Sequence, residues 1–405
     1  MQYQWRNQNY YEVNDMNQNW TYKKLGEICE ISAGQGAPQG EDKYCDDGIP
    51  FVKAGNIEDL LNGLDEYKIQ KVNDSVAKSH KLKLYKAGSV VFAKSGMSCM
   101  KGLVYTLKND CFVVSHLAIL TPKDVMSSFL NYTLNFYNPN TLVKDEAYPS
   151  ISLADISNHS IPVPPLSTQS RIVSELDLLQ SLIDKQKAQL KEYDTLAQSI
   201  FYDMFGDPVE NEKGWEVKKL GEIALVKIGP FGSLLHTSDY ISGGIPLVNP
   251  IHMKNGYIKP DYGFTISEEK KKEMLPYLLK KGDVVFARRG EIGRCAIVSE
   301  KEDGYLCGTG SLFVRFIKPI SEVFVLYLTK SDSFIKDLVS KAKGATMLNI
   351  NCKIVEDLRL TIPPQTLQQS FANKIEAIER QKSAISKSIA ETEKLFEYTM
   401  DKYFG

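Results

Sequence analysis

The chain has 405 residues, of which 43% are hydrophobic and 24% are charged, and its formal net charge is −1. This length predicts two or three domains, and the near-zero charge excludes a protein that is basic all over, so a site for a polyanion has to be local. No apolar stretch approaches the ~20 residues of a membrane span, which argues against a membrane protein.

The first 19 residues form a polar tail rich in Asn and Gln, which we expect to be poorly ordered and which does not resemble a signal peptide. The seven cysteines lie far apart, and none forms a C-x-x-C pair that would suggest zinc or redox chemistry. An odd number of cysteines without a secretion signal predicts reduced thiols and a cytoplasmic protein.

From Trp20 onward the chain contains an internal duplication. The string WTYKKLGEI at Trp20 returns as WEVKKLGEI at Trp215, and GSVVFAKSG at Gly88 returns as GDVVFARRG at Gly282. ISLADI at 151–156 returns as INCKIV at 350–355, and MFG at 204–206 as YFG at 403–405. These colinear matches, separated by 194 to 199 residues, predict two similar domains and not a solenoid.

Each copy has the same internal order. Short β-branched and aromatic runs, punctuated by Gly, Pro, Asn and Asp, come first and predict a mixed α/β domain that is mainly β. A Pro-Pro pair then precedes a helix start signal at Ser167 or Thr366. We therefore predict an α+β protein with domains at 1–166 and 207–365 and long helices at 167–206 and 366–405.

Both predicted helices carry a heptad pattern, with Gln186, Lys382 and Thr392 as polar gaps. The pattern favours an antiparallel coiled coil that relates the two domains by an approximate two-fold axis, although helices packed on their own domains remain an alternative. The apolar positions are Ile172, Leu176, Leu179, Ile183, Leu190, Tyr193, Ala197 and Ile200 in the first helix, and Phe371, Ile375, Ile378, Ile385, Ile389 and Phe396 in the second.

The clearest candidate binding residues are the arginines in GDVVFARRGEIGR. Arg288, Arg289 and Arg294 lie at turns beside a predicted strand, where guanidinium groups suit phosphates or the O6 and N7 atoms of guanine. The alternative is a solvated hairpin. The first copy has Lys94 and Ser95 at the same place and Lys101 soon after, so we expect a different base preference and mainly phosphate contacts there.

Two glycine-rich loops, 32–41 and 227–240, are weaker candidates. Such loops let backbone amides approach phosphate closely, and the second loop adds Ser233 and His236 as possible contacts. The other singleton histidine, His116, is interpreted as a core strand residue.

The arginine-containing run, the IP-x-P-P-x-x-x-Q junction into each helix, the Phe-Gly ends and the duplication resemble the specificity subunit of type I restriction–modification systems. The resemblance implies a DNA-reading, non-catalytic subunit in which each domain reads half of a bipartite target. The helices would space the halves and dock the modification (methyltransferase) subunits of a complex that also holds restriction subunits. It also implies that segments before each helix junction lie against DNA, with Tyr148, Ser150, Thr346 and Asn349 as candidate readers. The alternative is that these segments are only turns that lead into a strand.

Two other functions remain as alternatives. A catalytic function has little support, because NPNT and NPIH are not the N-P-P-aromatic motif of adenine methyltransferases and no strand–G-x-G–helix unit offers a cofactor site. The string from Pro260-Asp261 to Lys270 imitates a nuclease motif but reads as a charged helix start. A protein scaffold that ignores DNA is the second alternative. We expect no catalytic residue, no metal site and no cofactor in this chain, with S-adenosylmethionine, magnesium and ATP bound by partners.

Overall fold

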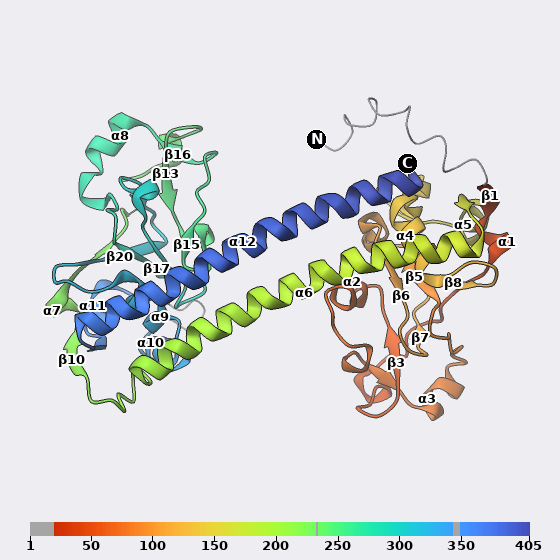
Figure 1. Cartoon of the computed structure of the whole chain (residues 1–405), viewed down its shortest axis with the longest axis horizontal. Helices are drawn as coiled ribbons and strands as arrows, with labels where there is room; N and C mark the ends of the chain where they lie inside the picture. The colour runs from red at the N-terminus through yellow and green to blue at the C-terminus, as the bar shows by residue number, and fades with distance from the viewer. Residues whose placement is uncertain (1–19, 232–233, 343–348) are drawn as a thin grey trace. The chain divides into compact units, whose positions relative to one another are not determined.

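The computed structural model describes residues 20–231, 234–342 and 349–405 (Figure 1). Contacts within the chain divide it into two units, one of residues 1–185 with 388–405 and one of residues 186–387. Each unit holds one copy of the sequence repeat together with a part of both long helices. Because each helix is shared between the units, the four-segment division predicted from the sequence stays a prediction.

Unit 1 is built around a four-stranded antiparallel sheet in the order β2-β8-β5-β6, accompanied by a three-stranded sheet β4-β3-β7 and the pair β1-β9. Its strands are β1 (Thr21–Lys24), β2 (Cys29–Ala33), β3 (Ile49–Val52), β4 (Lys71–Val72), β5 (Val90–Ala93), β6 (Val104–Thr106), β7 (Phe112–Val113), β8 (Leu117–Pro122) and β9 (Ser160–Val163). Its short helices are α1 (Leu25–Ile28), α2 (Asn56–Leu61), α3 (Asp74–Ser79), α4 (Ser127–Phe136) and α5 (Leu153–Asn158).

Unit 2 repeats this topology with the sheet β11-β20-β17-β18, the sheet β12-β16-β13-β19, and the pairs β10-β21 and β14-β15. Its strands are β10 (Glu216–Lys219), β11 (Ala224–Ile228), β12 (Tyr240–Ile241), β13 (Ile245–Val248), β14 (Met253–Lys254), β15 (Tyr257–Ile258), β16 (Thr265–Ile266), β17 (Val284–Ala287), β18 (Cys295–Ile297), β19 (Leu306–Cys307), β20 (Ser311–Phe316) and β21 (Arg359–Ile362). Its short helices are α7 (Leu220–Ile223), α8 (Glu268–Glu273), α9 (Glu322–Thr329), α10 (Asp332–Lys341) and α11 (Cys352–Glu356).

The sequence Val-Val-Phe-Ala forms a central strand in both units. All four residues are buried in β5 and in β17, as expected for β-branched and aromatic side chains in a strand that is covered on both faces. Their register is also the same, because Val90 lies opposite Leu120 and Val284 lies opposite Val314. The predicted mixed α/β fold of the repeated domains is confirmed.

The long helices are α6 (Leu166–Phe205) and α12 (Gln365–Phe404), and their predicted apolar seams are buried or half-buried throughout. In unit 1 the start of α6 meets the end of α12, where the Tyr403 hydroxyl donates to Glu175. In unit 2 the end of α6 meets the start of α12, where Lys382 Nζ lies 2.7 Å from Asp194 Oδ1. Within each unit, the segments of α6 and α12 therefore pair with each other, the start of one helix with the end of the other.

The ends of both helices also pack on the globular parts. The alternative predicted from the sequence, helices packed on their own domains, is therefore also present in part. In unit 2 the ring of Phe205 lies 4.8 Å from that of Phe324 in α9 and 5.3 Å from that of Phe371 in α12. In unit 1 the ring of Phe404 lies 5.7 Å from that of Phe129 in α4. The C-terminal end of each long helix is thus fixed by an aromatic cluster as well as by its partner helix.

A buried glutamine anchors the first turn of each long helix and explains the spacing of the Pro-Pro-x-x-x-Gln junction. In unit 1 the side chain of Gln169 accepts from the backbone N–H of Met126 at 2.9 Å and donates to the carbonyl of Pro164 at 2.9 Å. In unit 2 Gln368 accepts from the N–H of Ser321 at 2.9 Å and donates to the carbonyl of Pro363 at 2.8 Å. Each glutamine joins its long helix to the start of α4 or α9.

Candidate functional site

In unit 1 three chain segments meet at the end of β5. The backbone N–H of Lys94 donates to the carbonyl of His116 at 2.9 Å, and the N–H of Ile151 donates to the carbonyl of Lys94 at 2.8 Å. An isolated β-bridge pairs Ser95 with Ser150. We call this meeting of residues 94–96, 115–116 and 149–151 the strand-end frame of unit 1.

Unit 2 has the same strand-end frame at the end of β17, formed by residues 288–290, 309–310 and 349–350. The N–H of Arg288 donates to the carbonyl of Gly310 at 3.1 Å, and the N–H of Ile350 donates to the carbonyl of Arg288 at 3.1 Å. A β-bridge pairs Arg289 with Asn349. Several residues predicted from separate parts of the sequence are therefore neighbours, and they occupy equivalent places in the two units.

The two arginines of the unit 2 frame differ in their surroundings. Arg288 is only 7% exposed, and its Nε donates to Asn349 Oδ1 at 3.3 Å, while no carboxylate of the described residues pairs with it. Burial, together with the neighbouring charge of Arg289, lowers the pKa of the Arg288 guanidinium from its usual value. Arg289 is exposed to solvent. The frame thus contains one exposed guanidinium and one buried guanidinium that donates to Asn349.

Arg294 lies close to this frame but is held by local partners. Its guanidinium donates to the carbonyl of Pro250 at 3.1 Å and pairs with Glu291, and the side chain is half-buried. Because Glu291 compensates its charge, Arg294 is a weaker candidate for an anion contact than Arg289.

The unit 1 frame carries different side chains. Lys94 and Ser95 are half-buried, Ser150 is exposed, and Tyr148 is 83% exposed nearby in the sequence. The interpretation of His116 as a core strand residue is wrong, because His116 is exposed in the turn before β8 and its Nδ1 lies 2.9 Å from Ser95 Oγ. The second copy of the repeat indicates that His116 lies in a turn, because Thr309-Gly310 there aligns with Ser115-His116.

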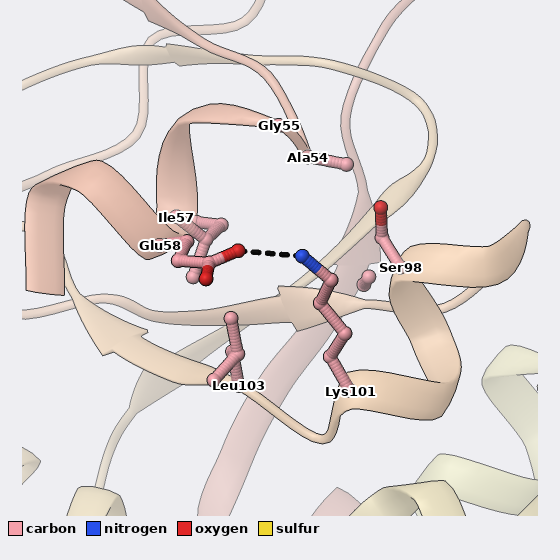
Figure 2. A pocket seen from close by; sticks show the side chains of 8 residues that line it. Ala54, Gly55, Ile57, Glu58, Ser98, Lys101 and Leu103 are labelled. Atoms are coloured by element: carbon pink, nitrogen blue, oxygen red, sulfur yellow. Dashed lines mark hydrogen bonds and ion pairs between the residues drawn. The ribbon is translucent and has the colours of Figure 1, made fainter. Parts of the chain in front are cut away.

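Lys101, the second predicted phosphate contact of unit 1, forms an ion pair with Glu58 across a small pocket (Figure 2). Lys101 Nζ lies 2.5 Å from Glu58 Oε2, and both side chains are more than half exposed. Exposed pairs of this kind are worth only about 0–1 kcal/mol, so Lys101 can exchange this partner for a phosphate at little cost. The pocket is also lined by Ala54, Gly55, Ile57, Ala93, Ser98 and Leu103.

The structure says less about the remaining predicted contact residues, His236, Ser233 and Thr346. His236 is exposed before a short 3₁₀ turn, where its backbone N–H donates to Asp239 Oδ2 at 2.7 Å. Ser233 and Thr346 lie outside the described residues. DNA contact by any of these residues, and by those of the two frames, stays a prediction.

The nuclease-like string does not bring its charged groups together. Asp261 Oδ1 accepts from the backbone N–H of Gly263 at 2.8 Å, whereas Lys270 pairs with Glu273 at 3.0 Å and with Asp239 at 3.5 Å. Over the described ranges there is no group of three or more His, Cys, Asp or Glu residues that could hold a metal ion. In the same ranges, no helix is long and apolar enough to cross a membrane.

Comparison with known structures shows where this fold occurs. The structure matches a type I restriction–modification S subunit from M. genitalium with a TM-score of 0.53 at 14% identity, covering 97% of this chain and 98% of that one. It also matches a chain from a structure of the assembly and conformational transition of the type I R-M system, with a TM-score of 0.57 at 18% identity and coverage of 96% and 98%. At these identities the likeness is one of fold.

The sequence comparisons identify the family. The specificity subunit of the type I restriction enzyme MjaIX of Methanocaldococcus jannaschii is 22% identical over 91% of this chain and 88% of its own length. A putative type I specificity subunit of Haemophilus influenzae is 22% identical over 93% of each chain. The model of the type I restriction modification DNA specificity domain matches residues 17–192 and 212–394, which is most of both repeats. The resemblance seen in the sequence is confirmed, and the chain belongs to the family of type I restriction–modification DNA specificity proteins.

Proposed function

We propose that this chain is the non-catalytic, sequence-reading subunit of a type I restriction–modification complex. Each unit reads one half of a bipartite, asymmetric DNA target, while partner subunits methylate and cleave. The observation that carries this proposal is the repeated strand-end frame, which has the same backbone hydrogen bonds in both units but presents Lys94 and Ser95 in one and Arg288 and Arg289 in the other. Two similar scaffolds with different polar side chains are what two different half-sites require.

The arginines of unit 2 supply the chemistry of base reading. A guanidinium can donate two parallel hydrogen bonds to O6 and N7 of guanine in the major groove, which is the commonest specific protein–DNA contact. Arg289 is exposed for such a contact, and the neighbouring Arg288 adds a second, buried positive charge. Asn349, across the β-bridge, adds a side chain of the type that pairs with adenine.

Independent reading by the two units is tested by exchanging residues 1–166 for the equivalent domain of another specificity subunit. The chimera is assembled with the modification subunits, and its methylated sites are sequenced. We expect one half of the target to change and the other half to stay the same. Linked changes in both halves would contradict the proposal.

The helices α6 and α12 set the spacer between the half-sites and dock the modification subunits in this proposal. Removing one heptad near Gln186 and one near Ile385 keeps the apolar seams in phase. At ~1.5 Å per residue the pair shortens by about 10 Å, or about three base pairs at ~3.4 Å each. We expect the variant to prefer a shorter spacer in a library of substrates that differ only in spacer length. It should also bind more weakly, because the half-sites rotate by roughly a third of a turn. If an active variant keeps its original preference for spacer length, the helices only dock the modification subunits and do not set the spacer.

A scaffold that recruits proteins without reading DNA makes a different prediction. Neutralisation of phosphates releases counterions, so the affinity of a DNA reader falls steeply as salt rises. We therefore expect the complex to bind a duplex containing its methylated sequence more tightly at ~50 mM than at ~200 mM salt. A complex that binds no duplex at either concentration would favour the scaffold.

A further inference from the structure

The pair formed by His116 and Ser95 has no counterpart in unit 2. We propose that His116 is a base-contacting residue for the half-site of unit 1 and that Ser95 holds its ring in position. This inference rests on the proposed function and adds to it a reading residue that differs in kind from the arginines of unit 2.

The geometry fixes one ring nitrogen and leaves the other for a ligand. The Nδ1 atom of His116 lies 2.9 Å from Ser95 Oγ, and the side chain is exposed. No hydrogen bond from its Nε2 to a described residue is present. Each tautomer of the ring suits an edge of a base pair in the major groove: a donating Nε2–H matches N7 or O6 of guanine, and an accepting Nε2 matches the amino group of adenine or cytosine.

The position of His116 in the strand-end frame also favours contact with DNA. Its carbonyl accepts from the residue that follows β5, as the carbonyl of Gly310 does after β17. A side chain at position 310 would be crowded, because Pro250 Cδ lies 3.1 Å from where a Cβ would be. Position 310 is therefore a glycine in unit 2, and the side chain that His116 presents in unit 1 has no counterpart there.

A purely structural role for the His116–Ser95 pair is the alternative, and the same unit contains a matched control. His80, at the end of α3, is also exposed, and its Nδ1 lies 3.0 Å from the hydroxyl of Ser79. His80 belongs to none of the three frame segments. Replacing it removes this histidine–serine contact, and a contact of the same Nδ1 with the carbonyl of Val76 at 3.1 Å, without changing the frame.

The test uses the complex with its modification subunits and a plasmid library in which each target base pair is varied singly. In His116→Ala we expect discrimination at one or two adjacent base pairs to fall about tenfold, only in the half-site that changes when residues 1–166 are exchanged. Ser95→Ala should relax the same base pairs to a smaller extent, and the double variant should relax them no further than His116→Ala. His80→Ala should keep the original preference.

Three results would overturn the inference. They are an unchanged base preference in His116→Ala, a loss of methylation that is equal for all sequences, and relaxation in the other half-site. Each leaves the proposed function standing as long as the unmodified complex still recognises both half-sites. A complex with no sequence preference in either half would overturn the proposed function and this inference together.

Discussion

Strands β5 and β17 contain the same four residues, Val-Val-Phe-Ala, but they differ at both ends. Before the strand, Ser89 Oγ lies 3.3 Å from Thr121 Oγ1 in unit 1, whereas unit 2 has the ion pair of Asp283 and Arg315 at the same places. After the strand, unit 1 continues with Lys94-Ser95 and unit 2 with a pair of arginines. The apolar run and the backbone frame determine the fold, and the strand ends vary as long as their buried polar groups have partners.

The largest effect that tests this comparison is expected for Asp283→Ala. Asp283 is 1% exposed and receives two hydrogen bonds from Arg315, at 2.8 and 2.6 Å, and one from the N–H of Lys280 at 2.8 Å. Removing one partner of a buried ion pair leaves the charge of the other uncompensated. We therefore expect the free energy of unfolding of unit 2 to fall by about 3 kcal/mol, which is at the low end of the range for buried ion pairs because Arg315 is partly exposed. Hydrogen exchange of the β17 and β20 amides measures this loss.

Ser89→Ala is the matched variant in unit 1, where only a neutral hydroxyl pair is lost. We expect the free energy of unfolding, measured by hydrogen exchange of the β5 and β8 amides, to fall by about 1 kcal/mol. The double variant Asp283→Ser with Arg315→Thr, which introduces the pair of unit 1, should recover most of the stability of unit 2. Equal losses in Asp283→Ala and Ser89→Ala would contradict this account of the strand starts.

The anchoring glutamines should behave alike in the two units. Gln169→Leu and Gln368→Leu each leave a part-buried backbone N–H and a proline carbonyl without a partner, which we expect to lower the free energy of unfolding by about 2 kcal/mol. Faster hydrogen exchange at the first amides of α4 and α9 would report the loss. Gln369→Leu is the control, because that neighbouring glutamine is exposed and bonds only to Asn373 among the described residues. A loss confined to one unit would show that the junctions are not equivalent.

The helices and central strands could be predicted from the sequence because their signals are local. Heptad spacing defined the seams of α6 and α12, and the two Val-Val-Phe-Ala runs defined the central strands. The Pro-Pro-x-x-x-Gln junction was recognised as a pattern, but the partners of its glutamine were not. Met126 and Ser321 lie more than 40 residues from Gln169 and Gln368, so only the folded structure reveals these bonds.

The candidate site was predicted less completely for the same reason. The β-bridges that join Ser95 to Ser150 and Arg289 to Asn349 connect distant segments, and spacing in the sequence does not indicate them. The prediction that His116 is a core strand residue is wrong because the sequence FVVSHLAIL resembles one continuous apolar strand. In the structure the run is divided, since β7 pairs with β3 while β8 pairs with β2 and β5, and the turn between them carries His116 to the surface.

The most direct test of the central claim concerns the arginines of the unit 2 frame. We expect Arg288→Ala with Arg289→Ala to lower discrimination in one half-site by tenfold or more, from a guanidinium–guanine contact worth about 1–3 kcal/mol. Arg359→Ala is the control, because it removes an exposed arginine of unit 2 from β21, away from the frame.

The decisive measurement is methylation of substrates mutated in each half-site separately. The account predicts that the double arginine variant tolerates changes in one half-site, retains full discrimination in the half-site that follows residues 1–166, and differs in this from Arg359→Ala. Equal relaxation of both half-sites would contradict the claim that each strand-end frame reads its own half of the target.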